Sequence, residues 1–249
     1  MKKNHHQNKG GELFLYGKHA VEAALNNPER TKIRLLLTKD FDDSIKIPSG
    51  LEFLRLSKEE LEKILPSGAV HQGIALSVKP LEELAIEDIC RLGDSKSKSI
   101  IVALDQVTDP HNIGAILRSA AAFGTDALII PDKNAPQEGG ALAKAACGAL
   151  EIVPLIRTTN LVRAMESLKA HGYWAIGMDG SAEQTLSSLS LPDKCIIILG
   201  SEGEGMRRLT IENCDFLTKL PISPRMESLN VSNAAAVALY EASRKLEIL

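Results

Sequence analysis

The sequence predicts an α/β protein whose larger part is a mostly parallel sheet covered by helices on both faces. From residue 100 onwards, short apolar runs alternate with longer segments of helical periodicity, which is the pattern of successive β/α units. The first run, 100–104 (IIVAL), has no polar alternation and is therefore typical of a strand buried on both faces. A length of 249 residues permits one large or two modest domains.

A smaller α/β unit is predicted over residues 13–79. Apolar residues at helical spacing predict a helix over 17–27. Ser57 and Glu60 match a capping box, which opens a second helix over 58–65. The predicted strands are 33–38, 51–56 and 73–78. The unit also holds a basic cluster, interpreted on its own as a solvated strand edge, that consists of Arg30, Lys32, Arg34 and Lys39.

The chain outside this unit divides into a tail, a linker and the larger domain. Residues 1–12 lack the apolar core of a secretory signal and are predicted to be a flexible tail. Residues 80–99 are predicted to be a linker, with a short helix over 81–92 and then a polar stretch. The larger domain, 100–249, has predicted strands at 100–104, 127–130, 152–156, 173–178, 195–199 and 216–220. Its predicted helices are 112–123, 139–149, 161–171 and 207–214, followed by a last helix that reaches the C-terminus.

Composition limits the classes of function. Hydrophobic residues make up 44% of the chain and charged residues 24%, and no apolar run approaches the ~20 residues that span a bilayer. The net charge of -3 argues against nucleic-acid binding by bulk attraction alone, although it leaves room for a local basic face. The four cysteines lie far apart, without a CxxC pair or zinc-type spacing. The cysteines are therefore predicted to occupy core positions, and their spacing predicts no metal site. The same cysteine usage favours a cytoplasmic location.

Polar residues gather where three predicted strands end, the edge at which open α/β sheets bind ligands. At the first end, 105–124, Asn112 can cap the helix that follows. Arg118 shares a helical face with small residues such as Gly114, whereas the opposite stripe is apolar and faces the core. An arginine that only faces solvent does not require small neighbours. We therefore interpret these small residues as leaving space above the helix for a functional Arg118 side chain. His111 is a second candidate in this segment.

The two other strand ends are equally polar. The end at 200–206 (GSEGEGM) holds glycines that let a backbone approach a ligand closely, and Glu202 adds a carboxylate. Arg207 and Arg208 follow, either to reach phosphates or as a solvated first helical turn. The end at 220–233 is either a well-capped helix start or a cofactor loop. Its polar residues are Ser228, Asn230, Ser232 and Asn233.

Three stretches together resemble one family. The motifs of the SpoU (TrmH-type) RNA ribose methyltransferases, members of the SPOUT superfamily, are matched in order and spacing by DPHNIGAILRSAAAFG, LGSEGEGM and LPISPRMESLNVSNAAAVALYEASR. This likeness covers the chain from residue 100 to the C-terminus. In the front half, YGKHAVEAAL and HQGIAL resemble the substrate-binding domain of the ribosomal-RNA branch, which is similar to the ribosomal protein L30e.

The resemblance implies a SPOUT domain with a deep C-terminal trefoil knot, a rare exception to the rule against knots. It further implies that S-adenosylmethionine binds in the knot, and that the protein is a homodimer with its sites near the subunit interface. Neither a metal nor a membrane is expected. The implied catalytic set is Asn112, Arg118, Glu202, Ser228 and Asn230. The implied cofactor-binding residues are Gly200, Leu220 and Leu229. One departure is 223–227 (SPRME), where many relatives carry glycine and serine.

The activity that the resemblance implies is methylation of a guanosine ribose 2′-hydroxyl in large-subunit (23S) ribosomal RNA. The protein would align the 2′-oxygen with the methyl group and help to remove a proton. The family proposal makes Arg118 the base. Because free arginine has a pKa of about 12.5–13.8, binding a phosphate and stabilising the oxyanion is the alternative role.

Two other functions stay open. A transfer-RNA ribose 2′-O-methyltransferase would use the same chemistry, but the separate front unit with its basic cluster disfavours it. A non-catalytic RNA-binding ribosome-assembly factor is disfavoured by the intact polar set in all three motifs. For any of these functions, the polar linker predicts that the front unit is mobile until RNA binds.

Overall fold

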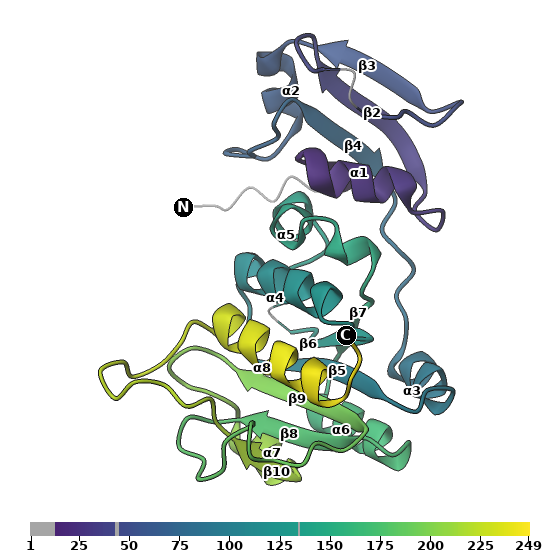
Figure 1. Ribbon diagram of the computed structural model, residues 1–249. Helices are drawn as coiled ribbons and strands as arrows, with labels where there is room; N and C mark the ends of the chain where they lie inside the picture. The colour runs from purple at the N-terminus through teal and green to yellow at the C-terminus, as the bar shows by residue number, and fades with distance from the viewer. Residues whose placement is uncertain (1–12, 43–44, 134) are drawn as a thin grey trace.

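The computed structural model describes residues 13–42, 45–133 and 135–249. The predicted tail, 1–12, lies outside the described residues. Two sheets lie one above the other, the front unit at the top of Figure 1 and the larger α/β unit below it. In the described ranges, no helix combines the length and the apolar character that crossing a membrane requires.

The front unit is a four-stranded sheet with two helices. Its elements are β1 (Leu13–Tyr16), α1 (Lys18–Asn26), β2 (Lys32–Thr38), β3 (Glu52–Leu56), α2 (Lys58–Ile64) and β4 (Ile74–Val78). The strand order is β1-β4-β2-β3, in which β4 is antiparallel to both of its neighbours and β3 is parallel to β2. The predicted capping box is confirmed, because Glu60 N donates to Ser57 Oγ at 3.2 Å and Ser57 N donates to Glu60 Oε2 at 2.7 Å. β1 was not predicted.

The larger unit is a six-stranded, all-parallel sheet of order β10-β8-β9-β5-β6-β7. Its strands are β5 (Ser99–Asp105), β6 (Ala127–Pro131), β7 (Leu155–Thr158), β8 (Trp174–Met178), β9 (Lys194–Gly200) and β10 (Phe216–Thr218). Its helices are α3 (Ile86–Asp94), α4 (Pro110–Ala122), α5 (Gly140–Ala146), the 3-10 turn η1 (Ala149–Glu151), α6 (Leu161–Ala170), α7 (Arg208–Glu212) and α8 (Val231–Lys245).

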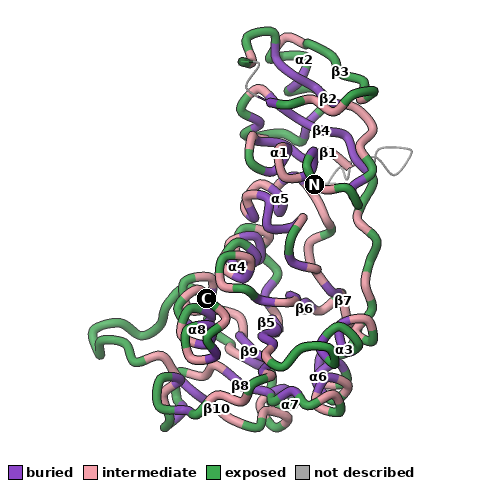
Figure 2. Tube along the Cα trace, turned by 45° about the vertical axis from the view of Figure 1, so that its right-hand side comes forward, coloured by how far each residue is buried: buried purple, intermediate pink, exposed green. Residues whose placement is uncertain are grey.

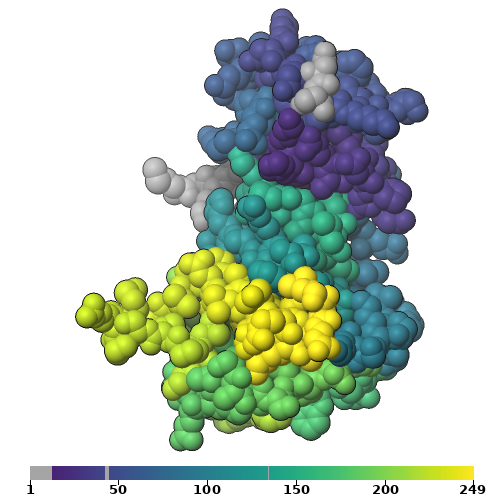
Figure 3. Space-filling view, viewed as in Figure 1, coloured from purple at the N-terminus to yellow at the C-terminus, as the bar shows by residue number. Residues whose placement is uncertain are grey.

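The central strand β5 separates two cores. Ile100, Val102 and Leu104 pack into one core with α4 and α8, whereas Ile101 and Ala103 pack into the other with α3 and α6. Every residue of β5 is buried, as its continuous apolar run predicted. Figure 2 shows the contrast with the segment between β10 and α8, which is exposed throughout 221–230 and projects from the body of the molecule in Figure 3.

The bounds of the predicted helix 139–149 and of the strand after it differ from those in the structure. The helix predicted over 139–149 ends at Ala146, because Cys147 and Gly148 both have positive φ angles, 49° and 92°, a conformation that an α-helix does not continue through. The η1 turn, Ala149–Glu151, follows directly, and the strand predicted over 152–156 is shifted towards the C-terminus, so that β7 spans Leu155–Thr158.

Two interpretations of single residues were wrong. Asn112 does not cap α4: the cap is Asp109, whose Oδ1 accepts a hydrogen bond from His111 N at 3.0 Å. Gly114 does not leave open space beside Arg118, because a Cβ there would lie 2.4 Å from the Cβ of Ala145 on α5. The small residue therefore lets two helices approach each other closely.

The interpretation of the basic cluster as a solvated strand edge was also wrong in one respect. The side chain of Arg30 is fully buried and forms ion pairs with Glu138 and Glu151 of the larger unit. The front unit and the larger unit are thus joined by a charged contact in addition to the covalent linker.

Candidate active site

Three segments that are distant in sequence meet at one point. The side-chain amide of Asn230, at the start of α8, donates to Glu202 Oε1 at 2.5 Å and to Asn112 Oδ1 at 3.2 Å. Glu202 Oε1 also accepts a hydrogen bond from Val231 N at 3.2 Å. Asn112 lies in the first turn of α4, and Glu202 follows β9. The structure therefore brings together one polar residue from each of the three motifs.

The sequence left the segment 220–233 as either a capped helix start or a functional loop, and Asn230 both caps the helix and joins the polar cluster. Its Oδ1 accepts a hydrogen bond from Ser232 N at 2.9 Å and so caps α8. Because the oxygen is committed to the helix, the amide NH₂ group faces Glu202 and Asn112. The cap fixes the rotamer that the polar cluster requires.

Gly200 permits the fold of the loop that carries Glu202. A Cβ at Gly200 would lie 2.0 Å from the carbonyl carbon of Gly205 and 2.2 Å from Met206 N. Ser201 and Gly205 exchange two backbone hydrogen bonds, at 3.1 and 2.9 Å, which close the loop upon itself. Only glycine allows this approach of two backbone segments.

A cavity of about 360 Å³ adjoins this cluster. Its lining comes from the end of β8, from the loop after β9 and from the segment before α8. Four of the predicted site residues line it, namely Gly200, Glu202, Ser228 and Leu229. Leu220 instead packs half-buried against the main core. A cavity beyond the carboxyl ends of parallel strands, lined by glycines, apolar side chains and a few polar groups, suits a small organic ligand.

Arg118 lies apart from the polar cluster. It is exposed on α4, and its Nη1 donates to Cys147 Sγ at 3.6 Å. Within the described ranges, no hydrogen bond or ion pair joins Arg118 to Asn112, Glu202 or Asn230. His111 is likewise exposed. Of the predicted set, the structure thus gathers all but Arg118 and Leu220 around the cluster and its cavity.

Sequence reasoning missed Asp105, the last residue of β5. Asp105 is fully buried, and its two carboxylate oxygens accept hydrogen bonds from Arg207 N at 2.8 Å and Arg207 Nε at 2.7 Å. Asp105 also pairs with Gly200 in the sheet register. Asp105 therefore holds both ends of the loop 200–206, Gly200 through the strand pairing of its backbone and Arg207 through its carboxylate. A charged residue that ends a wholly apolar strand was the signal for this role.

The two arginines after that loop have different surroundings. Arg207 donates from Nε to the buried Asp105 carboxylate at 2.7 Å while its side chain stays half-exposed, so that its contact with a phosphate stays a prediction. Arg208 is exposed and pairs with Glu212 one helical turn later, at 2.6 Å, which is the solvated first turn that the sequence offered as an alternative.

The four cysteines are all free. Cys90 and Cys195 are buried, and Cys147 and Cys214 are half-buried. Burial raises the pKa of the Cys195 thiol to about 12 and, helped by nearby carboxylates, that of Cys214 to about 12. In the described parts of the chain, no group of three or more histidine, cysteine or carboxylate side chains is arranged to hold a metal ion.

Comparison with protein families gives two matches. Residues 99–240 match the SpoU rRNA Methylase family. Residues 14–84 match the family described as RNA 2′-O ribose methyltransferase substrate binding.

Comparison with individual proteins gives relatives over nearly the whole chain. The 23S rRNA (guanosine-2′-O-)-methyltransferase RlmB of Pasteurella multocida is 42% identical over 93% of this chain and 97% of its own length. The RlmB of Escherichia coli K12 is 41% identical over 93% of this chain and 98% of its own length.

Solved structures share the fold. The SpoU methyltransferase AviRb from Streptomyces viridochromogenes, in complex with AdoMet, covers 94% of this chain and 90% of its own, with a TM-score of 0.79 at 21% identity. The TrmH/SpoU tRNA modifying enzyme of A. aeolicus covers 66% of this chain and 85% of its own, with a TM-score of 0.54 at 25% identity.

Proposed function

The chain belongs to the SpoU rRNA methylase family, and we propose that it transfers a methyl group to the ribose 2′-oxygen of a guanosine in 23S ribosomal RNA. The observation that carries this proposal is the similarity to enzymes named for that reaction, over 93% of this chain. The polar cluster of Asn112, Glu202 and Asn230 supports it, because a vestigial site in an assembly factor would have no reason to keep three motifs hydrogen-bonded together. The tRNA-modifying relative matches only 66% of the chain, which favours the ribosomal substrate.

S-adenosylmethionine is the proposed methyl donor, and the cavity of about 360 Å³ is its proposed site. The residues present fit such a group, because the cavity wall has open space at Gly180 and polar atoms at Ser228 and Glu202. When bound, the cofactor supplies a methyl group on a sulfonium leaving group. Gly200, Leu220 and Leu229 are the proposed cofactor-binding positions. Gly200 and Leu229 already line the cavity, whereas Leu220 would act from the segment that leads into it.

The residues of the chain align and stabilise the reacting ribose. Asn230, Asn112 and Ser228 orient the ribose, and Glu202 holds the loop after β9 against the start of α8. Arg118 binds the phosphate beside the target and stabilises the oxygen as it loses its proton. Its exposure and its distance from the cluster are consistent with action on RNA, or across a subunit boundary.

A homodimer is part of the proposal. Half-exposed apolar side chains, Val237 and Tyr240, lie on the outer face of α8, and Tyr240 packs edge to face on Phe123 at the end of α4. A surface of this kind, on the helix whose first turn adjoins the site, is suited to association with a second copy. Because α4, which carries Arg118, packs against α8, such an arrangement would place Arg118 close to the subunit interface.

The division of the chain is also proposed. An L30e-like front domain spans 13–79, a linker spans 80–99, and a SPOUT domain with a trefoil knot spans 100–249. The family matches at 14–84 and 99–240 support these bounds. The contact between the segment before α8 and the loop after β9 supports the knot. Since ribosomal RNA is the substrate, the cytoplasm is the proposed location.

The decisive experiment is mapping of ribose methylation in 23S rRNA from cells with and without the gene. We expect one guanosine to lose its 2′-O-methyl group in the deletion strain and to regain it on complementation. In parallel, the purified protein is incubated with labelled S-adenosylmethionine and either 23S rRNA or total tRNA. Label in tRNA alone would replace the proposed substrate, and label in neither RNA, with the modification map unchanged, would refute the activity.

A further inference from the structure

Arg30 is a buried cation that joins the front unit to the larger unit. It lies between α1 and β2, and its side chain is fully buried. Its Nη2 lies 2.6 Å from Glu151 Oε1, and its Nε donates to both oxygens of Glu151 at 3.1 Å. Its Nη1 lies 2.7 Å from Glu138 Oε1 and donates to the backbone oxygen of Lys79 at 3.0 Å. Most of the guanidinium donors are therefore engaged across the junction.

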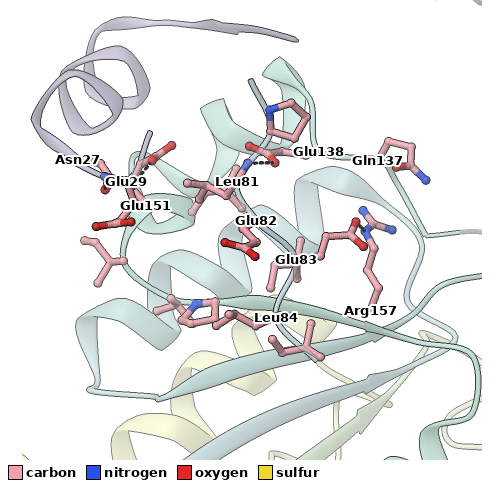
Figure 4. Close-up of a pocket in the computed structure, with 17 residues that line it drawn as sticks. Asn27, Glu29, Leu81, Glu82, Glu83, Leu84, Gln137, Glu138, Glu151 and Arg157 are labelled. Carbon is pink, nitrogen blue, oxygen red and sulfur yellow. Dashed lines mark hydrogen bonds and ion pairs between the residues drawn. The ribbon is translucent and has the colours of Figure 1, made fainter. Parts of the chain in front are cut away.

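The two carboxylates hold more than Arg30. Glu151 Oε2 accepts a hydrogen bond from Asn27 Nδ2 at 2.7 Å, and Glu138 Oε2 accepts one from Leu81 N at 3.3 Å. Glu138 precedes α5 and Glu151 ends η1, whereas Asn27 closes α1 and Leu81 lies in the connection. In Figure 4, Asn27 lies beside Glu151, and a dashed line joins Leu81 to Glu138. The front unit, the connection and the larger unit are thus fixed at one point.

Apolar packing extends this junction along α5. A Cβ at Gly140 would lie 2.0 Å from the ring of Tyr16, and a Cβ at Gly148 would lie 2.7 Å from Ala23. Figure 1 shows α5 between α1 and α4. α5 also packs closely against Gly114 of α4. Because α4 carries Arg118, α5 connects the front unit to the helix on which Arg118 lies.

Separation of the two units would cost free energy at this network. A guanidinium that loses its carboxylate partners while still buried is strongly unfavourable, so that opening requires hydration of all three charges together. The planar guanidinium group of arginine also fixes the directions of its hydrogen bonds, which a lysine ammonium group would not do. The network therefore favours one orientation of the front unit over neighbouring ones.

We propose that Arg30 is a positioning residue, which holds the front unit in one orientation on α5 before RNA binds. RNA bound by the front unit would then reach Arg118 and the Asn230 cluster in a fixed register. The consequence for methylation depends on the proposed function, but the fixed orientation does not. This proposal opposes the expectation, drawn from the polar linker, that the front unit is mobile until RNA binds.

The test compares four forms of the full-length protein: the native chain, Arg30→Ala, the charge exchange Arg30→Glu with Glu151→Arg, and the control Arg91→Ala. The exchange keeps the net charge of the junction and the ion pair between positions 30 and 151, although it places a carboxylate at position 30 opposite Glu138. Arg91 is a matched control because its ion pair with Asp88 is exposed and lies within α3. Small-angle X-ray scattering reports the orientation, and a Glu-specific protease reports access to Glu82 and Glu83 in the exposed connection.

For Arg30→Ala we expect a larger radius of gyration, faster cleavage of the connection and a loss of kcat/KM on 23S rRNA of about 10- to 100-fold, as misplaced substrate causes. S-adenosylmethionine affinity should not change, because its site lies in the larger unit. The charge exchange should recover part of both the compact scattering and the kcat/KM, whereas Arg91→Ala should match the native protein.

Two results would overturn the proposal: a native scattering profile that already matches Arg30→Ala, or unchanged kcat/KM for Arg30→Ala. If Arg30→Ala does not fold, Glu151→Gln takes its place with the same expectations. If no form methylates RNA, the proposed function has failed, and the scattering and cleavage results still decide whether Arg30 fixes the orientation.

Discussion

The side-chain amide of Asn230 donates a hydrogen bond of 2.5 Å to Glu202, which joins the start of α8 to the loop after β9. The same carboxylate oxygen accepts the backbone N–H of Val231. Because both groups lie at the surface, this contact contributes little to folding. Its consequence is geometric, since it fixes Asn230 beside the cavity and beside Asn112.

Glu202→Ala is therefore expected to lower the rate of methyl transfer while leaving the fold intact. Loss of the carboxylate frees the amide of Asn230, and misalignment of this kind costs about 10- to 100-fold in rate. Single-turnover methylation and a thermal melt of the same sample measure the two effects. Glu204→Ala, an exposed change in the same loop, is the control. Equal losses in both variants would show that the loop, not the contact, matters.

Substitutions of Arg118 separate its two possible roles. Arg118→Ala should lower kcat by about 100- to 1,000-fold, which is the typical loss when a donor to a developing oxyanion is removed. Arg118→Lys keeps the charge and should recover part of the rate with the same pH profile. Near-native turnover with a lower pH optimum would contradict this expectation. That outcome would identify a proton acceptor, since lysine loses its proton at about pH 10.4, below arginine.

Asp105 is expected to matter mainly for stability. Asp105→Ala leaves Arg207 without its buried partner and removes the anchor of the loop 200–206. Breaking a buried ion pair from one side costs about 3–5 kcal/mol, but Arg207 is half-exposed and can turn to solvent, so we expect about 2 kcal/mol. Urea unfolding measures the change. Glu183→Ala, which removes an exposed carboxylate, should leave the midpoint unchanged.

The sequence predicted most of the sheet because the signals were local. The run 100–104 is apolar at every position, and its residues do pack alternately into two cores. β1 was missed because it is short and finds its partner only in β4, a pairing that no local pattern encodes. The three motifs were predicted to converge, and Asn112, Glu202 and Asn230 do so.

The remaining errors concern what a residue contacts. A glycine at position 114 is compatible both with open space beside Arg118 and with a closely packed helix. The sequence alone does not distinguish the two, and in the structure α5 fills the space. Asn112 and Asp109 are both good caps, and Pro110 at the first helical position decides for Asp109. Arg30 looked solvated because its neighbours in sequence are charged, whereas its partner Glu151 lies 121 residues away.

Cysteine reactivity follows from burial. With a pKa of about 12 for Cys195 and for Cys214, only about one thiol in 10,000 is ionised at pH 8, and the thiolate is the reactive form. Both should resist iodoacetamide until the protein unfolds. Cys147 is half-buried and contacts Arg118, so we expect it to react first and methylation to fall as it does. Mass spectrometry of timed samples gives the order. Early modification of Cys195 would contradict the packing of β9.

Gly200→Ala tests whether the close approach of two backbone segments builds the cofactor site. The added Cβ would meet the carbonyl carbon of Gly205 at 2.0 Å, and because backbone is harder to displace than a side chain, the loop must open. We expect S-adenosylmethionine affinity to fall at least 10-fold, measured by calorimetry, with a lower melting temperature. Gly180→Ala is the matched control, since Gly180 lines the same cavity with no atom within 4 Å of its added Cβ. If Gly180→Ala weakens binding as much as Gly200→Ala does, occupied space in the cavity rather than loop shape limits affinity, and the role assigned to Gly200 is wrong.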